Sequence, residues 1–275
     1  KTSVVASLAC LIEGKAMADC DVDAANLSLV LSPRVIEEKD FAAGKKARII
    51  TEKCTACGIC RDMCRFGAIS EDFFVDTVSC EGCGACFFFC PASAVEFETP
   101  LAGHCYICAT PAGEPFVYAE LLPGEENSGK LVTIVRAEAR ARAESFGLSR
   151  ILIDGPPGIG CPVISSLTGT SLALIVTEPT ASGVHDLERI IELTRHFQIP
   201  AAVIINKSDI NPDCTNSIEG YCVQKDIRLL GCLPYESAIS EAQRQGKAIV
   251  QYAPDLPASQ AMRGISEQIK TLYKE

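Results

Sequence analysis

The residues best suited to chemistry are eight cysteines between positions 54 and 90. They form two runs with identical spacing, namely Cys54, Cys57, Cys60 and Cys64, then Cys80, Cys83, Cys86 and Cys90. A cubane iron–sulfur cluster needs four thiolate ligands, so four cysteines in so short a stretch, twice over, predict two clusters. Two zinc sites are the alternative, although zinc sites usually combine two separated pairs of ligands.

This spacing resembles that of the bacterial ferredoxins, in which the fourth cysteine of each run serves the other cluster. The resemblance implies one 4Fe-4S cluster bound by Cys54, Cys57, Cys60 and Cys90. It implies a second 4Fe-4S cluster bound by Cys80, Cys83, Cys86 and Cys64. A segment of roughly 50 residues buries too little apolar surface to fold without cross-links such as disulfides or bound metal, so the clusters are expected to act as its core.

A second group of residues is typical of a phosphate site. Lys1 and Thr2 open an apolar helical pattern. A lysine and a hydroxyl at the start of a helix can hold nucleotide phosphates and Mg²⁺, although a helix can also begin with this pair by chance. A short apolar strand is then expected to end at Asp19 and Asp21, with Asn26 following. Carboxylates at the carboxyl end of a strand lie where α/β sheets bind ligands, but the same residues are also ordinary in turns.

Further candidate residues follow three later strands. The strand over residues 150–153 ends at Asp154, and a turn containing Gly158 follows. The strand over residues 201–206 ends at Asn206, with Asp209 next, and the strand over residues 229–233 leads to Pro234. Strands alternate with helices throughout this half of the chain, which predicts a parallel sheet covered on both faces. Residues 34–53 are polar and basic and are expected to form a linker or a short edge strand.

Three cysteines outside the two runs are weaker candidates. Cys105 and Cys108 form a single C-x2-C pair, which could share a metal with its copy in a second chain or could be two buried thiols in a loop. Cys161 lies seven residues after Asp154. The nitrogenase iron protein carries a cluster-ligating cysteine at the same interval, although no counterpart of its other ligand is evident here.

The composition limits the classes of function. The chain has 275 residues and a formal net charge of −10, so nonspecific binding to nucleic acid or to an anionic membrane is not expected. The sixteen cysteines include eight in cluster spacing, which indicates a reducing cytoplasm. No apolar run is long enough to span a bilayer, and stable membrane insertion is not expected. No signal peptide is visible, and because residue 1 is a lysine the natural start is expected upstream.

Taken together, the strand-end motifs resemble those of the MinD/ParA/Mrp branch of P-loop ATPases, with a ferredoxin domain inserted between the second and third motif. The resemblance implies an α/β fold, in which a P-loop NTPase with a mostly parallel, doubly wound sheet carries a small α+β di-cluster ferredoxin domain. We expect the ATPase domain at residues 1–48 and 99–275 and the insert at residues 49–98. The glycine-rich loop and the signature lysine of this branch are expected before residue 1.

The resemblance also implies roles for individual residues. Lys1 would contact the phosphates and Thr2 would bind Mg²⁺, while Asp21 would position the attacking water. Asp154 would belong to switch II, and Asn206 would contact adenine. Four further residues are expected beside the nucleotide or its Mg²⁺, namely Asn26, Gly158, Asp209 and Pro234. ATP or ADP would bind at the interface of a homodimer, or of a heterodimer with a related ATPase.

We weighed three functions on this basis. The favoured one is a slow Mg²⁺-dependent ATPase that assembles or transfers iron–sulfur or related metal cofactors, with an apo-metalloprotein as partner. The alternative is ATP-gated electron transfer to a redox partner. A positioning ATPase of the MinD or ParA kind is less favoured because of the cysteine-rich insert and the acidic charge.

Overall fold

The computed structural model describes residues 1–125 and 128–272. The chain divides into two compact units. The first comprises Lys1–Glu38, Cys105–Ala119 and Ser128–Glu275, and the second comprises Lys39–His104 and Glu120–Asn127. The second unit is wider than the insert expected at residues 49–98, and that boundary stays a prediction.

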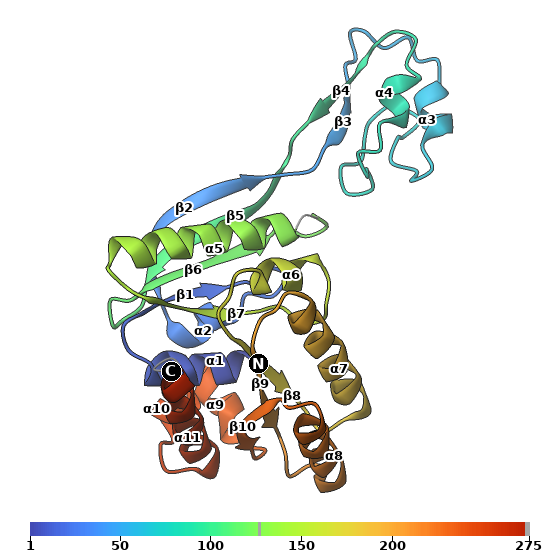
Figure 1. The fold of residues 1–275 in the computed structure, drawn as a ribbon. Coiled ribbons are helices and arrows are strands. Elements are labelled where there is room, and N and C mark those ends of the chain that lie inside the picture. Colours follow the sequence, from blue (N-terminus) through green and yellow to red (C-terminus); the bar gives the residue numbers. More distant parts are fainter. Residues whose placement is uncertain (126–127, 273–275) are drawn as a thin grey trace. The chain divides into compact units, whose positions relative to one another are not determined.

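Two sheets carry the carboxyl-terminal strand ends on which the site is built (Figure 1). The five-stranded sheet has the order β2-β5-β6-β1-β7, with the strands Arg34–Ala42, Leu101–Ala109, Pro115–Leu121, Lys15–Asp19 and Arg150–Asp154. Strand β1 pairs in parallel with both β6 and β7. The three-stranded sheet has the order β10-β9-β8, is parallel throughout, and consists of Arg228–Leu233, Ala201–Asn206 and Ala173–Thr177.

Strand β9 shows why helices cover both faces of the smaller sheet. Successive side chains of a strand point to opposite faces. Ala202 and Ile204 contribute to one hydrophobic cluster, whereas Val203 and Ile205 contribute to another. Because neither face can be left in water, an uninterrupted apolar strand of this kind requires helices on both sides. The sequence-based expectation of alternating strands and helices is met here.

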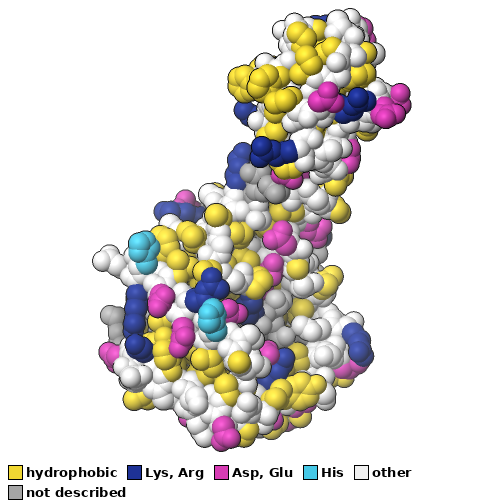
Figure 2. Space-filling model, turned by 90° about the vertical axis from the view of Figure 1, so that its right-hand side faces the viewer, with side chains coloured by type: hydrophobic (Ala, Val, Ile, Leu, Met, Phe, Trp, Pro, Cys, Tyr) yellow, Lys and Arg dark blue, Asp and Glu magenta, His cyan; other side chains and the backbone are white. Residues whose placement is uncertain are grey.

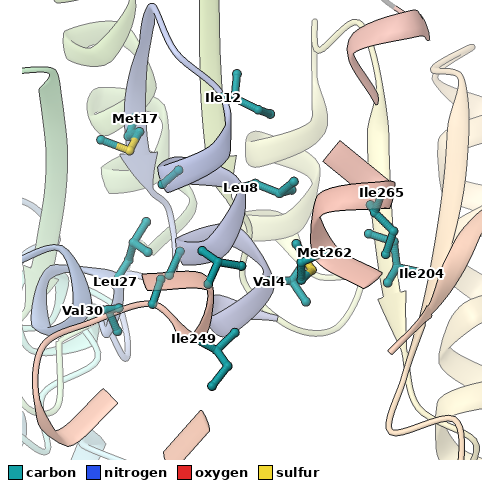
Figure 3. Close-up of a cluster of buried hydrophobic side chains, with 14 of the residues drawn as sticks. Val4, Leu8, Ile12, Met17, Leu27, Val30, Ile204, Ile249, Met262 and Ile265 are labelled. Carbon is teal, nitrogen blue, oxygen red and sulfur yellow. The ribbon is translucent and has the colours of Figure 1, made fainter. Parts of the chain in front are cut away.

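The helices of the first unit supply that cover (Figure 1). The cluster of Figure 3 joins α1 (Thr2–Leu11), α2 (Leu27–Leu31), α9 (Ala238–Arg244), α10 (Ile249–Tyr252) and α11 (Pro257–Leu272) to strands β1, β9 and β10. The other cluster joins α7 (Ala181–His196) and α8 (Pro212–Gln224) to β9. Helix α5 (Ser128–Ser145) packs on α6 (Cys161–Leu167) and on β1. These contacts hold α1 and α6, which flank the expected nucleotide residues, against the sheet.

The second unit has little regular structure. It contains the antiparallel pair β3 (Lys46–Ile49) and β4 (Val95–Glu98) and the short helices α3 (Ile59–Met63) and α4 (Ala85–Phe88). Its small core includes two of the cysteines, Cys60 and Cys80. Figure 2 shows hydrophobic side chains on the surface of this unit, where Phe74 and Phe88 are among the most exposed.

Residues 34–42 form a longer strand than the linker or short edge strand expected from the sequence. Strand β2 lies at the edge of its sheet, and nearly all its side chains are exposed. The strand is held by backbone hydrogen bonds to β5. Because its side chains are exposed, its sequence lacks the alternation of apolar and polar residues that normally indicates a strand.

Candidate functional site

Each of two hollows in the second unit is lined by four cysteines. The first measures about 300 Å³ including the open space at its mouth, and its cysteines are Cys54, Cys57, Cys60 and Cys90. The second measures about 350 Å³ on the same basis, and its cysteines are Cys64, Cys80, Cys83 and Cys86. Each set therefore takes three cysteines from one run and one from the other. The structure brings together the two sets that the sequence predicted, and their role as cluster ligands stays a proposal.

The two cysteine loops follow the same backbone path. Residues at matching positions adopt left-handed conformations, with φ of 54° at Ala56 and 60° at Gly82, and of 81° at Gly58 and 86° at Gly84. Gly58 and Gly84 immediately precede α3 and α4, which carry the third cysteine of each run. A Cβ atom at Gly82 would overlap the carbonyl oxygen of Lys45, so this position accepts only glycine.

Backbone amides point at several of the sulfur atoms. The amide of Ala56 donates to Cys54 Sγ at 3.4 Å, that of Ala94 to Cys90 Sγ at 3.2 Å, and that of Ala47 to Cys80 Sγ at 3.5 Å. Such donors stabilise a thiolate and tune the potential of a cluster. No three or more His, Cys, Asp or Glu side chains within residues 1–125 and 128–272 are arranged to hold a single metal ion. The four cysteines that line each hollow are the donor set of an iron–sulfur cluster, which would supply one-electron chemistry.

Two buried carboxylates form the centre of the second candidate site, in the first unit. Asp19 ends β1 and Asp154 ends β7, and the two residues are register partners on these adjacent parallel strands. The backbone amides of Asp21 and Leu27 donate to the carboxylate of Asp19 at 3.1 and 3.0 Å. Oδ2 of Asp154 is buried and has no hydrogen-bond partner in the described structure. An acceptor left bare in this way is suited to a cation or its bound water.

Burial controls the ionisation of this pair. Burial, followed by the nearby charge of Asp154, raises the pKa of Asp19 to about 7. Burial also raises the pKa of Asp154, against the effect of a hydrogen bond with the side chain of Thr2. Two adjacent carboxylates in a poorly solvated place favour a bound cation, because the cation removes their mutual repulsion.

Lys1 and Asp21 complete the acidic site. Lys1 Nζ donates to the carbonyl oxygen of Gly155 at 3.2 Å. Burial lowers the pKa of the Lys1 side chain, while Asp154, Asp21 and Asp19 act to raise it, so the ammonium lies within the field of all three carboxylates. Burial raises the pKa of Asp21, which is half-buried, and the charge of Lys1 opposes that shift. The structure thus brings Lys1, Thr2, Asp21 and Asp154 together, as the sequence predicted.

Sequence reasoning placed Asp19 at a strand end where ligands bind, but it gave Asp19 no specific role at the nucleotide. The signal for it was present, since it is the last residue of a strand that is buried at every position. Asn26 and Gly158 lie beside the same site. Asn26 is exposed directly before α2, whose first amide binds Asp19. Gly158 has a φ of 86° in the turn between β7 and α6.

The remaining expected residues gather at the carboxyl ends of β8, β9 and β10. Asn206 ends β9 as the register partner of Leu233, which immediately precedes Pro234. Asp209 Oδ1 accepts a hydrogen bond from the amide of Tyr235 at 2.6 Å. Glu178, which follows β8, accepts a hydrogen bond from Asn206 Nδ2 at 3.2 Å and pairs with Lys207 at 3.0 Å. Sequence reasoning missed the contribution of Glu178.

The third group of expected residues does not come together. Cys105 and Cys108 both lie in β5, and residues three apart on a strand point to opposite faces. Both are buried, and Cys108 belongs to the hydrophobic cluster of Figure 3. The two thiols therefore do not form a chelating pair, and they are not on the surface where a second chain could share a metal with them. Cys161, by contrast, is exposed at the start of α6.

Comparison with known proteins agrees with this geometry. Solved structures of the MinD cell division protein resemble the chain, with a TM-score of 0.56 for that of Aquifex aeolicus at 17% identity, covering 98% of this chain and 89% of that one. The MinD of Pyrococcus furiosus gives a TM-score of 0.57 at 17% identity, with 98% and 93% covered. The fold is therefore that of the MinD/ParA P-loop NTPases, as the sequence predicted.

Sequence matches narrow the assignment. A family model described as ParA, NUBPL iron-transfer P-loop NTPase, matches residues 142–270, and one described as a 4Fe-4S binding domain matches residues 47–70. The uncharacterized protein MJ0578 of Methanocaldococcus jannaschii is 37% identical over 216 residues, which cover 77% of this chain and 75% of that protein. The chain belongs to the ParA/NUBPL family of P-loop NTPases of the MinD/ParA/Mrp type, and it contains a 4Fe-4S binding domain.

A more distant relative is named for its function. The cytosolic Fe-S cluster assembly factor Nubp1 homolog of Drosophila pseudoobscura is 28% identical over 146 residues, which cover 46% of each chain. Within the described residues, no helix is both long enough and apolar enough to cross a membrane.

Proposed function

We propose that this protein binds and slowly hydrolyses Mg-ATP and uses the cycle to assemble or transfer iron–sulfur or related metal cofactors. The observation that carries the proposal is the pairing of two four-cysteine hollows with a buried carboxylate pair in one chain. Membership of a family described as iron-transfer NTPases supports the same conclusion. The work is proposed to take place in the cytoplasm.

The proposed nucleotide site follows from the groups on each strand end. Lys1 would contact the β- and γ-phosphates, and the hydroxyl of Thr2 would bind Mg²⁺. Asp154 would hold the Mg²⁺ and its water, while Asp21 would orient the attacking water. Asp19 would carry charge opposite the cation and fix the start of α2 through the amide of Leu27. The base would lie toward Asn206, Asp209 and Pro234.

The two cysteine sets would hold two resident 4Fe-4S clusters. The chain would work as a homodimer, or as a heterodimer with a related ATPase, together with an apo-metalloprotein that receives the metal. In this arrangement the exposed Cys161 is the remaining candidate contact for a transferred metal, since Cys105 and Cys108 lie in the core.

Transfer itself provides the test. Anaerobic protein loaded with labelled iron is mixed with an apo-ferredoxin, with Mg-ATP, with Mg-ADP and without nucleotide. We expect ATP to accelerate the appearance of holo-ferredoxin, and we expect the Asp21→Ala variant to bind ATP but to lose the acceleration. Equal transfer rates under all three conditions would reject the proposal.

ATP-gated electron transfer is the second candidate, and one observation favours it. Each four-cysteine set is complete without any other thiol, and the one further C-x2-C pair is buried on two faces of a strand. On this alternative the clusters stay bound and ATP shifts their reduction potential. A shift of about 60 mV in a one-electron couple is about 1.4 kcal/mol, which is within the usual range of coupling energies. Redox titration with ATP and with ADP distinguishes the two functions.

A further inference from the structure

We propose that Glu178 orients the side-chain amide of Asn206 and thereby makes the nucleotide site select adenine over guanine. The inference rests on the proposed function, because it takes the ends of β8, β9 and β10 as the place of the base. It adds a role for Glu178, to which the proposed nucleotide site assigns none, and a preference between two purines.

The relevant contact lies at the level where β8 and β9 end. Thr177 is the register partner of Ile205, so Glu178 and Asn206 are the next residues on the two neighbouring strands. Asn206 Nδ2 donates to Glu178 Oε1 at 3.2 Å. Lys207 Nζ lies 3.0 Å from the same carboxylate and helps to hold it in place.

The carboxylate decides which way the amide points. An ionised glutamate can only accept hydrogen bonds, whereas an asparagine amide carries one donor end and one acceptor end. The donor end of Asn206 must therefore face Glu178. The acceptor oxygen, Oδ1, is then the end left for a ligand.

An acceptor at this position distinguishes the two purines. Adenine presents an amino group at its 6-position, which donates, whereas guanine presents a carbonyl oxygen there, which accepts. Oδ1 of Asn206 can accept from the amino group of adenine and is repelled by the oxygen of guanine. If the amide were free to turn, its donor end would serve guanine equally well, so the preference depends on Glu178.

Asp209 provides the competing explanation. It is exposed, and a carboxylate there could accept from the 2-amino group and the ring N–H of guanine. Its Oδ1, however, already accepts from the amide of Tyr235 at 2.6 Å. The loop is further tied to β10 by the amide of Ser208, which donates to the carbonyl oxygen of Leu233 at 2.9 Å. Asp209 thus stabilises the loop, and the side-chain amide of Asn206 is the better candidate for recognising the base.

The test compares the affinities of Mg-ATP, Mg-GTP and Mg-ITP for the full-length protein as encoded. ITP has the 6-oxygen of guanine but lacks its 2-amino group. We expect the parent protein to bind ATP more tightly than both others, and to bind GTP and ITP equally. Glu178→Gln should lower the ratio of ATP to GTP affinity about three- to tenfold, which is the usual effect of one neutral hydrogen bond. Glu188→Gln, the same change at an exposed position of α7, is the control and should keep the parent ratio.

The outcomes separate this inference from the proposed function. If Glu178 served only to stabilise the fold, Glu178→Gln would lower the affinities for all three nucleotides by the same factor. The ratio of ATP to GTP affinity would then be unchanged, which would overturn the inference. Tighter binding of GTP than of ITP in the parent would overturn it as well, because it would show that a carboxylate reads the 2-amino group. These parent measurements hold even if the variant fails to fold. Failure of all three nucleotides to bind would overturn the proposed nucleotide function, and this inference with it.

Discussion

Asp19 and Asp154 stand opposite each other at the ends of β1 and β7, and their side chains are only 0% and 2% exposed. Two carboxylates so placed are costly when both are ionised and no cation lies between them. A cation bound between them would relieve this repulsion. The pairing also makes the stability of the first unit depend on pH in a defined direction.

The pH dependence follows from the raised pKa of Asp19. The pKa of an aspartate in an unfolded chain is about 3.9, and burial raises that of Asp19 to about 7 in the folded protein. The folded state thus holds the proton more tightly, and this contribution to stability is lost as the pH rises toward about 7. Without Mg²⁺ and nucleotide, the melting temperature of the first unit should fall from about pH 5.5 to about pH 7.5.

The matched variant is Asp19→Asn, which should melt with a smaller dependence on pH over that range. Adding Mg-ADP should raise the melting temperature of the parent more at the higher pH, because the ionised carboxylates attract the cation. The same pH slope in parent and variant would show that Asp19 does not titrate in this window.

Substitutions of Lys1 and Asp21 should affect nucleotide binding and ATP hydrolysis separately. Lys1→Ala removes the positive charge at the phosphates, and we expect the Kd for Mg-ATP to rise at least about 30-fold, because a bound nucleotide would cover this charge pair and leave the phosphate without its partner. Asp21→Ala should leave the Kd nearly unchanged and abolish hydrolysis. Lys225→Ala, a change at an exposed lysine after α8, is the control for the loss of charge. Normal hydrolysis by Asp21→Ala would mean that another group positions the water.

Gly82 and Gly67 offer a matched pair in the second unit. Their φ angles are 60° and 64°, so alanine pays a similar backbone cost at either position, about 1 kcal/mol. Only at Gly82 would the new Cβ also overlap the carbonyl oxygen of Lys45, whereas nothing lies near it at Gly67. Gly82→Ala should therefore lose iron to a chelator much faster than Gly67→Ala. Equal rates of iron loss would argue against a tight turn at Gly82.

Cys105 and Cys108 should be dispensable for metal. The double variant Cys105→Ala/Cys108→Ala should retain its iron and its transfer rate, since the two thiols lie on opposite faces of β5. The expected cost is in stability alone, at about 1 kcal/mol for each buried residue made smaller. Iron analysis and the ferredoxin assay measure both properties. Loss of transfer with normal iron content would restore the ligand role first considered for this pair.

Sequence reasoning succeeded where the chemistry is local. The cysteine spacing is that of the bacterial ferredoxins, and this resemblance implied the two sets before any fold was known. The strand-end aspartates were visible for a similar reason, because a polar residue after an apolar run stands out. The length of strand β2 was underestimated, because its side chains are exposed and its sequence shows no apolar alternation.

The failures concern contacts made by folding. The pairing of Asp19 with Asp154 depends on strand register, and the contact of Glu178 with Asn206 joins residues 28 positions apart. The spacing of Cys105 and Cys108 is the same as that of a metal-binding loop. Only their place in a strand shows that they point apart.

The most direct test of the account is the iron content and the electron paramagnetic resonance spectrum of anaerobic protein carrying Cys64→Ser or Cys90→Ser. The parent should contain about eight irons and eight sulfides, as two cubane clusters require. Cys64→Ser should alter the same cluster signal as Cys83→Ser, and Cys90→Ser the same signal as Cys57→Ser, because each hollow combines both runs. If Cys64→Ser instead altered the signal that Cys57→Ser alters, or if the parent bound zinc in place of iron, the account would be contradicted.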